Sequence, residues 1–186
     1  NDIPVFKLNQ LQNLFNLVEN VLNKNIAPLN GLVLAGGEST RMGKDKAELK
    51  YFGKGHSLYM LDLLTPFVEQ SFLSKKINKD LKQNVIEDKF YDLGPFGAIC
   101  SAFRFNPNLA YLVLATDLPY INEALLEKLI SQRDSSKLAT AVKGKKSEFP
   151  EPLICIWEPK AYPVLLSYLS QGISCPRKIL INEDIK

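Results

Sequence analysis

The sequence is poor in the residues that build metal sites and disulfide frameworks. Its 186 residues include three cysteines and one histidine. The cysteines, Cys100, Cys155 and Cys175, are widely spaced, odd in number and not arranged as a C-x-x-C pair. This pattern argues against a disulfide framework and against a zinc site. We therefore expect a protein of the reducing cytoplasm.

Long apolar runs and a strong charge of one sign are also absent. No apolar stretch approaches the roughly 18 residues of a membrane-spanning helix, and no signal-peptide pattern is present. The formal net charge of +3 is mild, so it suits a small anionic substrate without requiring nucleic acid. With 46% hydrophobic residues, the composition is that of one globular domain with a real core. We expect no membrane and no nucleic-acid partner, while the oligomeric state stays open.

The most informative stretch is LVLAGGESTRMGKDKA, from Leu32 to Ala47. Its apolar start predicts a buried central strand, and the adjacent Gly36 and Gly37 let the backbone approach a ligand closely. Arg41 and Lys46 add cationic side chains suited to phosphate oxygens. The stretch therefore predicts a phosphate-binding loop, although a glycine-rich connection with a solvated charged tip has the same composition.

Neither of the two best-known phosphate loops fits this stretch. A Walker A loop has four residues between its first glycine and its Gly-Lys pair, whereas five residues separate Gly37 from Gly43 and Asp45 follows Lys44. The dinucleotide fingerprint G-x-G-x-x-G is broken by Gly36-Gly37-Glu38.

LAGGESTRMGKDKA instead resembles the signature L-A-G-G-x-S-x-R-M-G-x-D-K-A of the molybdenum cofactor guanylyltransferases, the MobA-like branch of the nucleotidyltransferases. Every fixed position is present, and the resemblance covers about residues 29–180. It implies a three-layer, Rossmann-like, doubly wound α/β fold with a mainly parallel sheet. It also implies transfer of GMP from GTP to the terminal phosphate of molybdopterin, with Mg²⁺ as cofactor and pyrophosphate as the second product.

The order of the expected elements independently predicts a doubly wound α/β domain with ligand sites at the carboxyl ends of its strands. We expect strands at residues 31–35, 71–74, 84–86, 109–115 and 138–142. We expect helices at residues 57–69 and 123–130, and a glycine-proline turn followed by a helix within residues 92–102. The resemblance implies two further helices, at about residues 160–169 and 172–180. Pro66 should kink the helix at residues 57–69 or end it early, near Thr65. His56 just precedes this helix, where a solvated or capping role is favoured over a catalytic one.

The resemblance implies roles for residues of the first loop. Leu34, Ala35 and Gly36 are expected against the nucleotide, and Lys46 on it. Gly36 and Gly37 supply a backbone cradle, while Arg41 and Lys46 supply fixed positive charge during attack on the α-phosphorus.

Three further site residues come from later in the chain. Asp117 follows an apolar strand and matches the family's D-x-P metal position, where it would bind Mg²⁺; by itself it also fits a turn-capping role. Asp88 matches a family position that contacts the base or ribose. Ser74 stands where the family often has Asn, and a hydroxyl offers different hydrogen bonds from an amide.

Other segments depart from the family pattern. In GPFGAI, from Gly94 to Ile99, Phe96 replaces the leucine and Ala98 the last glycine of G-P-L-x-G-I. Cys175 stands where the family's late helix has Ser. Arg177 and Lys178 in that helix fit either a contact with the acceptor's phosphate or a solvated face. The family's N-x-N-T-P-x-D ending is absent, so we expect an incomplete C-terminal edge of the sheet.

Residues 1–28 precede the nucleotidyltransferase domain, which we assign to residues 29–186. Apolar residues at three- and four-residue spacings over residues 5–22 predict an amphipathic helix. This helix fits the tail of a fused N-terminal domain, a docking helix for a partner domain or a dimer contact.

Two other functions stay open at this stage. The first is a related enzyme, either a cytidylyltransferase on the same cofactor or an NTP transferase acting on another phosphorylated small molecule. The second is a non-catalytic nucleotide-binding module. Retention of both the first loop and Asp117 argues against the second, because a scaffold has no physical need for that pair.

Overall fold

Strand β1, Leu29–Leu34, lies at the middle of the molecule, and its sequence explains why. Leu32 and Leu34 join one apolar cluster, whereas Leu29 and Val33 join another on the opposite face of the strand. A strand with apolar contacts on both faces must be covered on both sides, as its uninterrupted apolar run predicts.

The computed structural model describes residues 7, 10–24, 26–35, 50–51, 54–76, 84–116, 118, 121–145 and 147–186. Besides β1, the strands in these ranges are β2 (Lys50–Tyr51), β3 (Lys54–Gly55), β4 (Ser71–Lys75), β5 (Val85–Glu87), β6 (Ala110–Ala115), β7 (Ala139–Val142) and β8 (Glu151–Trp157). The main sheet has the order β5-β4-β1-β6-β8-β7, and β2 pairs with β3 in a separate hairpin. β5, β4, β1 and β6 are parallel, while β8 runs antiparallel to β6 and β7. The predicted mainly parallel α/β sheet is confirmed.

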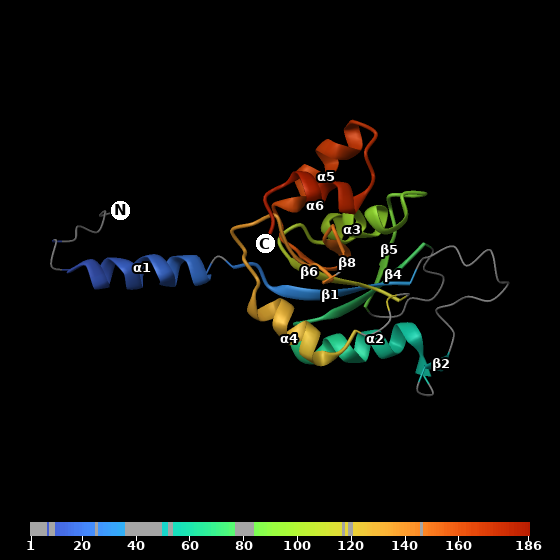
Figure 1. The fold of residues 1–186 in the computed structure, drawn as a ribbon, viewed down its shortest axis with the longest axis horizontal. Coiled ribbons are helices and arrows are strands. Elements are labelled where there is room, and N and C mark those ends of the chain that lie inside the picture. The colour runs from blue at the N-terminus through green and yellow to red at the C-terminus, as the bar shows by residue number, and fades with distance from the viewer. Residues whose placement is uncertain are drawn as a thin grey trace.

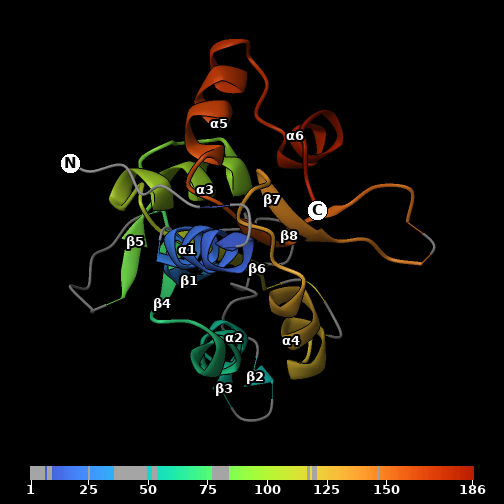
Figure 2. The ribbon, with the colours of Figure 1, turned by 90° about the vertical axis from the view of Figure 1, so that its left-hand side faces the viewer.

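Helices cover both faces of this sheet and complete three layers. They are α2 (His56–Leu64) with the 3₁₀ turn η3 (Thr65–Phe67), α3 (Gly94–Phe105), α4 (Glu123–Ser131), α5 (Ala161–Ser170) and α6 (Pro176–Asn182). Figures 1 and 2 show α3, α5 and α6 on one face and α2 and α4 on the other. α2 ends directly before Thr65-Pro66, as predicted from the proline. Gly31 lets α2 approach β1, because a Cβ there would lie 2.8 Å from Leu64 Cδ1.

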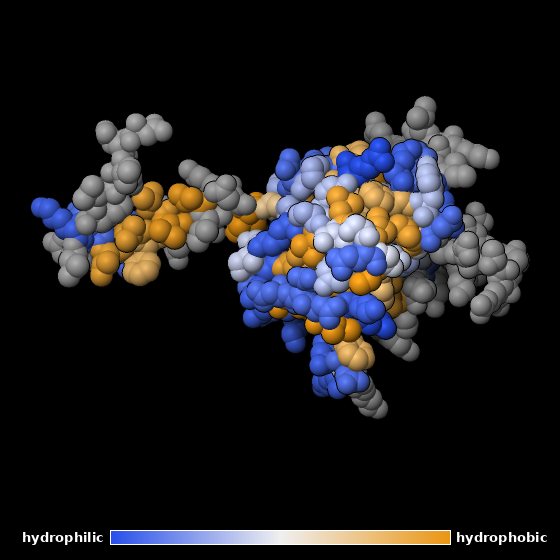
Figure 3. All heavy atoms as spheres, turned by 90° about the horizontal axis from the view of Figure 1, so that it is seen from above, coloured by the Kyte–Doolittle hydropathy of each residue, from blue (hydrophilic) through white to orange (hydrophobic). Residues whose placement is uncertain are grey.

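Helix α1, Leu11–Lys24, stands apart from the layered body, at the end of the sheet where β1 begins (Figure 1). Its apolar side chains are exposed, with exposed fractions of 52% for Leu11, 61% for Phe15 and 45% for Val18. Figure 3 shows apolar surface along the projecting helix. The predicted amphipathic helix is confirmed over this range. No helix in the described ranges is long and apolar enough to cross a membrane.

Strand β7 lies at one edge of the main sheet, and the backbone of residues 184–186 runs alongside it. Lys186 donates its N–H to Ala139 O at 2.9 Å and accepts the Ala141 N–H at 3.0 Å. The Leu138 N–H also donates to Asp184 O at 3.0 Å. Residues 184–186 therefore provide hydrogen-bond partners for part of β7, at the edge of the sheet that we expected to be incomplete.

Candidate functional site

The carboxyl ends of β5, β4, β1 and β6 form one edge of the sheet. Leu34 of β1 is level with Ser74 of β4 and with Ala115 of β6, and Ser74 is level with Ile86 of β5. The segments that follow these strands therefore begin side by side. The strand that precedes Asp117 in the sequence, β6, is a direct neighbour of β1 and pairs with it in parallel. Such an edge is where open α/β sheets bind ligands.

Hydrogen bonds join these four strand ends into one continuous row. Thr116 Oγ1 donates to Leu34 O at 3.3 Å, and the Ala35 N–H donates to Ser74 O, also at 3.3 Å. Ser74 Oγ in turn donates to Asp88 Oδ1 at 2.5 Å. The end of each strand is thus fixed relative to its neighbour, which gives the site a preorganised floor.

Asp88 is a buried carboxyl group at the β5 end of this row. Its exposed fraction is 7%, and that of Ser74 is 1%. The Asp88 N–H donates to Lys75 O at 2.8 Å, which fixes the backbone beside β4. Burial raises the pKa of Asp88, while the hydrogen bond from Ser74 and the positive charge of Lys76 act in the opposite direction. When ionised, this group can accept hydrogen bonds from N–H or O–H groups of a bound molecule.

The structure brings four of the predicted site residues to this edge: Leu34, Ala35, Ser74 and Asp88. The side chain of Leu34 packs in the apolar core and its carbonyl accepts the bond from Thr116, so only its backbone is available at the edge. The other predicted site residues lie outside the described residues, and their roles stay predictions: Gly36, Gly37, Arg41, Lys46 and Asp117.

Thr116 belongs to the edge and was not predicted as a site residue. Its hydroxyl is the link between β6 and β1. The signal was its position directly before Asp117 in Thr116-Asp117-Leu118-Pro119, but a threonine at a strand end also fits an ordinary β-branched strand residue.

The first residues of β8 extend the same edge beyond β6. Because β8 is antiparallel to β6, with Leu114 opposite Ile154, β8 begins where β6 ends. Glu151, its first residue, accepts an ion pair from Arg177 of α6 at 3.2 Å, and the Arg177 side chain is half exposed. The sequence left two interpretations of Arg177, a solvated helix face and a contact with an anion. The structure places its guanidinium beside this end of the sheet.

No three His, Cys, Asp or Glu side chains among the described residues come together as a metal site. The predicted metal ligand Asp117 is not one of these residues. His56 is half-buried at the start of α2, where its ring lies edge-on to that of Tyr59 with centroids 6.3 Å apart. That contact fits a structural role for the histidine.

Comparisons with known proteins point to one family. The model of the MobA-like NTP transferase domain matches residues 31–184. A molybdenum cofactor biosynthesis bifunctional protein of Synechocystis is 39% identical over 162 residues, which are 84% of this chain and 47% of that protein. A probable molybdenum cofactor guanylyltransferase of Flavobacterium johnsoniae is 29% identical over 141 residues, 75% of this chain and 73% of the relative. The chain thus spans just under half of the bifunctional relative.

A solved structure shares the fold. The molybdopterin-guanine dinucleotide biosynthesis protein A of Archaeoglobus fulgidus superposes with a TM-score of 0.67 at 24% sequence identity. The superposition covers 84% of this chain and 80% of that protein. At this identity the likeness concerns the arrangement of strands and helices, and it agrees with the sheet order described above.

Proposed function

This chain belongs to the MobA-like NTP transferase family, and from this premise we propose that it transfers GMP from GTP to the terminal phosphate of molybdopterin that carries molybdenum. An oxygen of the acceptor phosphate attacks the α-phosphorus of GTP, a new P–O bond forms, and the bond to the β-phosphate breaks to release pyrophosphate. The observation that carries the proposal is the edge where β5, β4, β1 and β6 end together, with Asp88, Ser74 and Ala35 in one hydrogen-bonded row.

We assign the residues of the first loop to the triphosphate. Gly36 and Gly37 leave room for the backbone to donate N–H groups to phosphate oxygens, and Arg41 and Lys46 neutralise the charge that develops on the transferred phosphorus and on pyrophosphate. Ala35 and the backbone of Leu34 lie where the nucleotide passes the end of β1. The chemistry is achieved by positioning and fixed charge, with no covalent intermediate on the protein.

We assign Mg²⁺ to Asp117. The donor chemistry fits, because Mg²⁺ typically takes one or two carboxylates together with substrate phosphate oxygens, and Asp117 directly follows Thr116 at the end of β6. When bound, the ion would stabilise the charge on the phosphates during transfer.

Asp88 and Ser74 are assigned to the base or ribose of the nucleotide, on the opposite side of β1 from β6. Their mutual hydrogen bond is the specific reason to keep a second candidate, because the Ser74 hydroxyl donates to Asp88 where relatives often offer an amide. That candidate is cytidylyl transfer to the same cofactor. Calorimetric binding of GTP, CTP, ATP and UTP separates the two, and preference for CTP would contradict the guanylyl assignment.

Loss of catalysis in two variants tests the proposed machinery. We expect Asp117→Asn and Lys46→Ala to lower pyrophosphate release from GTP and molybdopterin by at least about a hundredfold, because each removes charge that the transition state needs. Circular dichroism should show that both variants stay folded. Asp184→Asn and Lys128→Ala are matched surface controls and should retain full activity.

Near-normal rates in both site variants would overturn this assignment. GTP binding by the wild-type chain without any release of pyrophosphate would instead favour a non-catalytic nucleotide-binding module.

We also propose that the apolar face of α1 packs against a separate folded domain. Its exposed Leu11, Phe15 and Val18 need a cover, and one relative of this chain is a bifunctional protein of which the chain spans 47%. The polar face of α1 has few cationic residues, which disfavours a lipid surface as the cover.

A further inference from the structure

The loop between β5 and α3 is held on α3 by one buried hydroxyl. Ser101 lies inside α3 with an exposed fraction of 2%. Its Oγ accepts the Lys89 N–H at 2.8 Å and the Phe90 N–H at 3.4 Å, and it donates to Gly97 O at 2.7 Å. Both acceptor positions and the single donor of the hydroxyl are therefore used.

Gly97, one helical turn before Ser101, provides the second half of this contact. A Cβ on Gly97 would lie 2.2 Å from Phe90 O, so the loop backbone rests directly on the helix backbone. Ala98 replaces the usual glycine, and the position that must lack a side chain in this chain is residue 97.

The contact begins one residue after Asp88. Asp88 is fixed on its other side by its backbone bond to Lys75 O and by the side-chain bond from Ser74. Lys89 and Phe90 leave the sheet at once and meet α3. We call the contact of Ser101 and Gly97 with the backbone of Lys89 and Phe90 the clamp. The clamp fixes the direction in which the chain departs from Asp88. α3 itself is a rigid base, since Phe103 packs edge-on to Tyr111 of β6 and the Tyr111 hydroxyl donates to Ala102 O at 2.8 Å.

We propose that Ser101 and Gly97 are positioning residues for nucleotide recognition, which act by holding Asp88 in the orientation that meets the base or ribose. The inference rests on the proposed function. Neither residue touches the reacting phosphorus in this scheme, so the clamp serves affinity and choice of nucleotide, whereas the rate of the bound complex depends on the first loop and Asp117.

The test compares Ser101→Ala with Thr140→Val. Thr140 is equally buried, with 2% exposed, and its hydroxyl also accepts a backbone N–H, that of Asp134 at 3.1 Å, but it lies on β7. Both variants lose one buried hydroxyl, so both should unfold at lower denaturant concentrations than wild type. Ser101→Ala should weaken GTP binding by about tenfold in calorimetry, while Thr140→Val stays within about twofold of wild type. Pyrophosphate release at saturating GTP should change by less than about threefold in either variant.

Ser101→Cys keeps the shape of the side chain with weaker hydrogen bonds, so it provides a milder variant that should show an intermediate loss of affinity. Equal GTP binding by wild type, Ser101→Ala and Ser101→Cys would overturn the clamp alone. A wild-type chain that binds none of the four nucleoside triphosphates would overturn the proposed function and the clamp with it. If wild type prefers another triphosphate, guanylyl transfer fails, and the same comparison of variants on the preferred nucleotide decides the clamp.

Discussion

Asp88 is a carboxyl group whose surroundings disfavour its ionised form. It is nearly inaccessible to water, and the Ser74 hydroxyl and the charge of Lys76 offset only part of the cost of burial. A residue selected for stability alone would be neutral here. The presence of a carboxyl group whose charged form is penalised by burial, at the edge of the sheet, is typical of a group that binds or reacts, which supports its assignment to the nucleotide.

The pH dependence of stability checks this reasoning. Because burial raises the pKa of Asp88 in the folded state, the protonated form is favoured there, and the stability it contributes is lost as pH rises from the ordinary aspartate range through the raised value. The unfolding free energy of wild type should therefore fall relative to that of Asp88→Asn as pH rises from about 4 to 7. Denaturant titrations at a series of pH values measure this difference.

Ser74→Ala is the matched control for that experiment. It removes the hydrogen bond that lowers the pKa of Asp88, so the loss of stability should become larger and extend to higher pH. A flat difference between wild type and Asp88→Asn across this range would show that Asp88 is ionised in the folded state without cost. At neutral pH, Asp88→Asn should bind GTP more weakly than wild type although it is no less stable.

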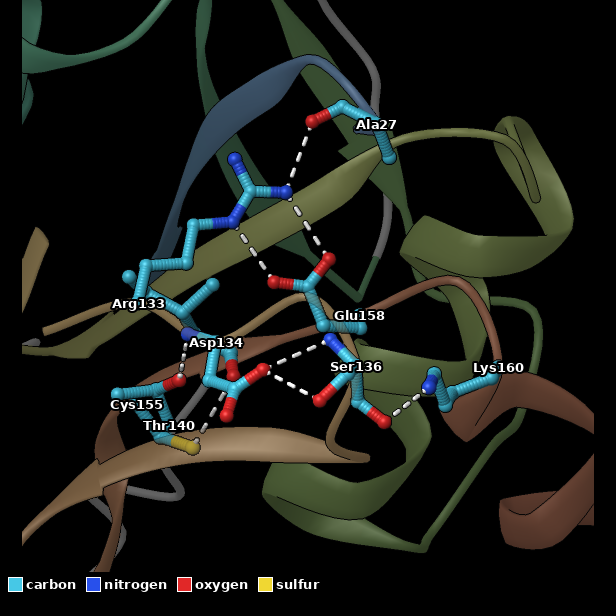
Figure 4. A network of polar contacts seen from close by, with 9 residues as sticks. Ala27, Arg133, Asp134, Ser136, Thr140, Cys155, Glu158 and Lys160 are labelled. Atoms are coloured by element: carbon cyan, nitrogen blue, oxygen red, sulfur yellow. Dashed lines mark hydrogen bonds and ion pairs between the residues drawn. The ribbon is translucent and has the colours of Figure 1, made fainter. Parts of the chain in front are cut away.

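At the scale of elements, one buried ion pair joins three segments at the end of the sheet opposite the site. Arg133, just after α4, donates from Nε and an Nη to both carboxylate oxygens of Glu158 at 2.7 and 2.9 Å. The same guanidinium donates to Ala27 O at 2.8 Å, on the chain that leads into β1 (Figure 4). Glu158 is 1% exposed, so the guanidinium of Arg133 offsets the cost of burying its carboxylate.

Arg133→Ala should therefore be strongly destabilising. It leaves Glu158 buried without its partner, and the loss of unfolding free energy should be about 3 to 5 kcal/mol. Lys137→Ala breaks the Lys137–Asp184 pair, in which Asp184 is 77% exposed, and should have a far smaller effect. GTP affinity of the folded protein should be unchanged in both variants, because neither pair lies at the edge where β1 ends. Similar stability for the two variants in urea titrations would refute the special role of the buried pair.

At the scale of the whole molecule, the features that local chemistry dictates could be predicted from the sequence. β1 and β6 are apolar runs because both of their faces are covered, and α2 stops at Leu64 because of Pro66. The position of Asp88 at this edge follows from a general property of parallel sheets. The carboxyl ends of their strands lie at the same edge, so the loops that follow these strands also lie there.

Features that depend on pairing could not be predicted in this way. The direction of β8 leaves no mark in Glu151–Trp157, since an apolar strand reads alike whether it runs parallel or antiparallel. The β2–β3 hairpin was not predicted, because strands of two residues have no periodicity to detect. Ser101 gave no signal, because a serine among small residues of a helix looks like close packing until its contact with the Lys89 and Phe90 amides is known.

The boundary of the domain can be placed more sharply by two truncations. Removing residues 1–24 deletes α1, whose apolar side chains are exposed, so the unfolding free energy should stay within about 0.5 kcal/mol of the full chain and GTP affinity within about twofold. Removing residues 1–28 also deletes the Ala27 and Pro28 carbonyls, which accept from Arg133 and from the Ala110 N–H at 2.8 and 2.9 Å. This second truncation should cost about 1 to 3 kcal/mol more, because it leaves buried donors without acceptors.

Equal stability of the two truncated chains in denaturant titrations would contradict the contribution of Ala27 and Pro28. A large loss already on removing residues 1–24 would show instead that α1 packs on its own domain. Light scattering of the full chain and of the chain from residue 25 shows whether residues 1–24 form a dimer contact. If the apolar face of α1 packs against a separate domain, both chains should be monomers. A dimer that requires residues 1–24 would mean that α1 packs against a second copy of this chain instead.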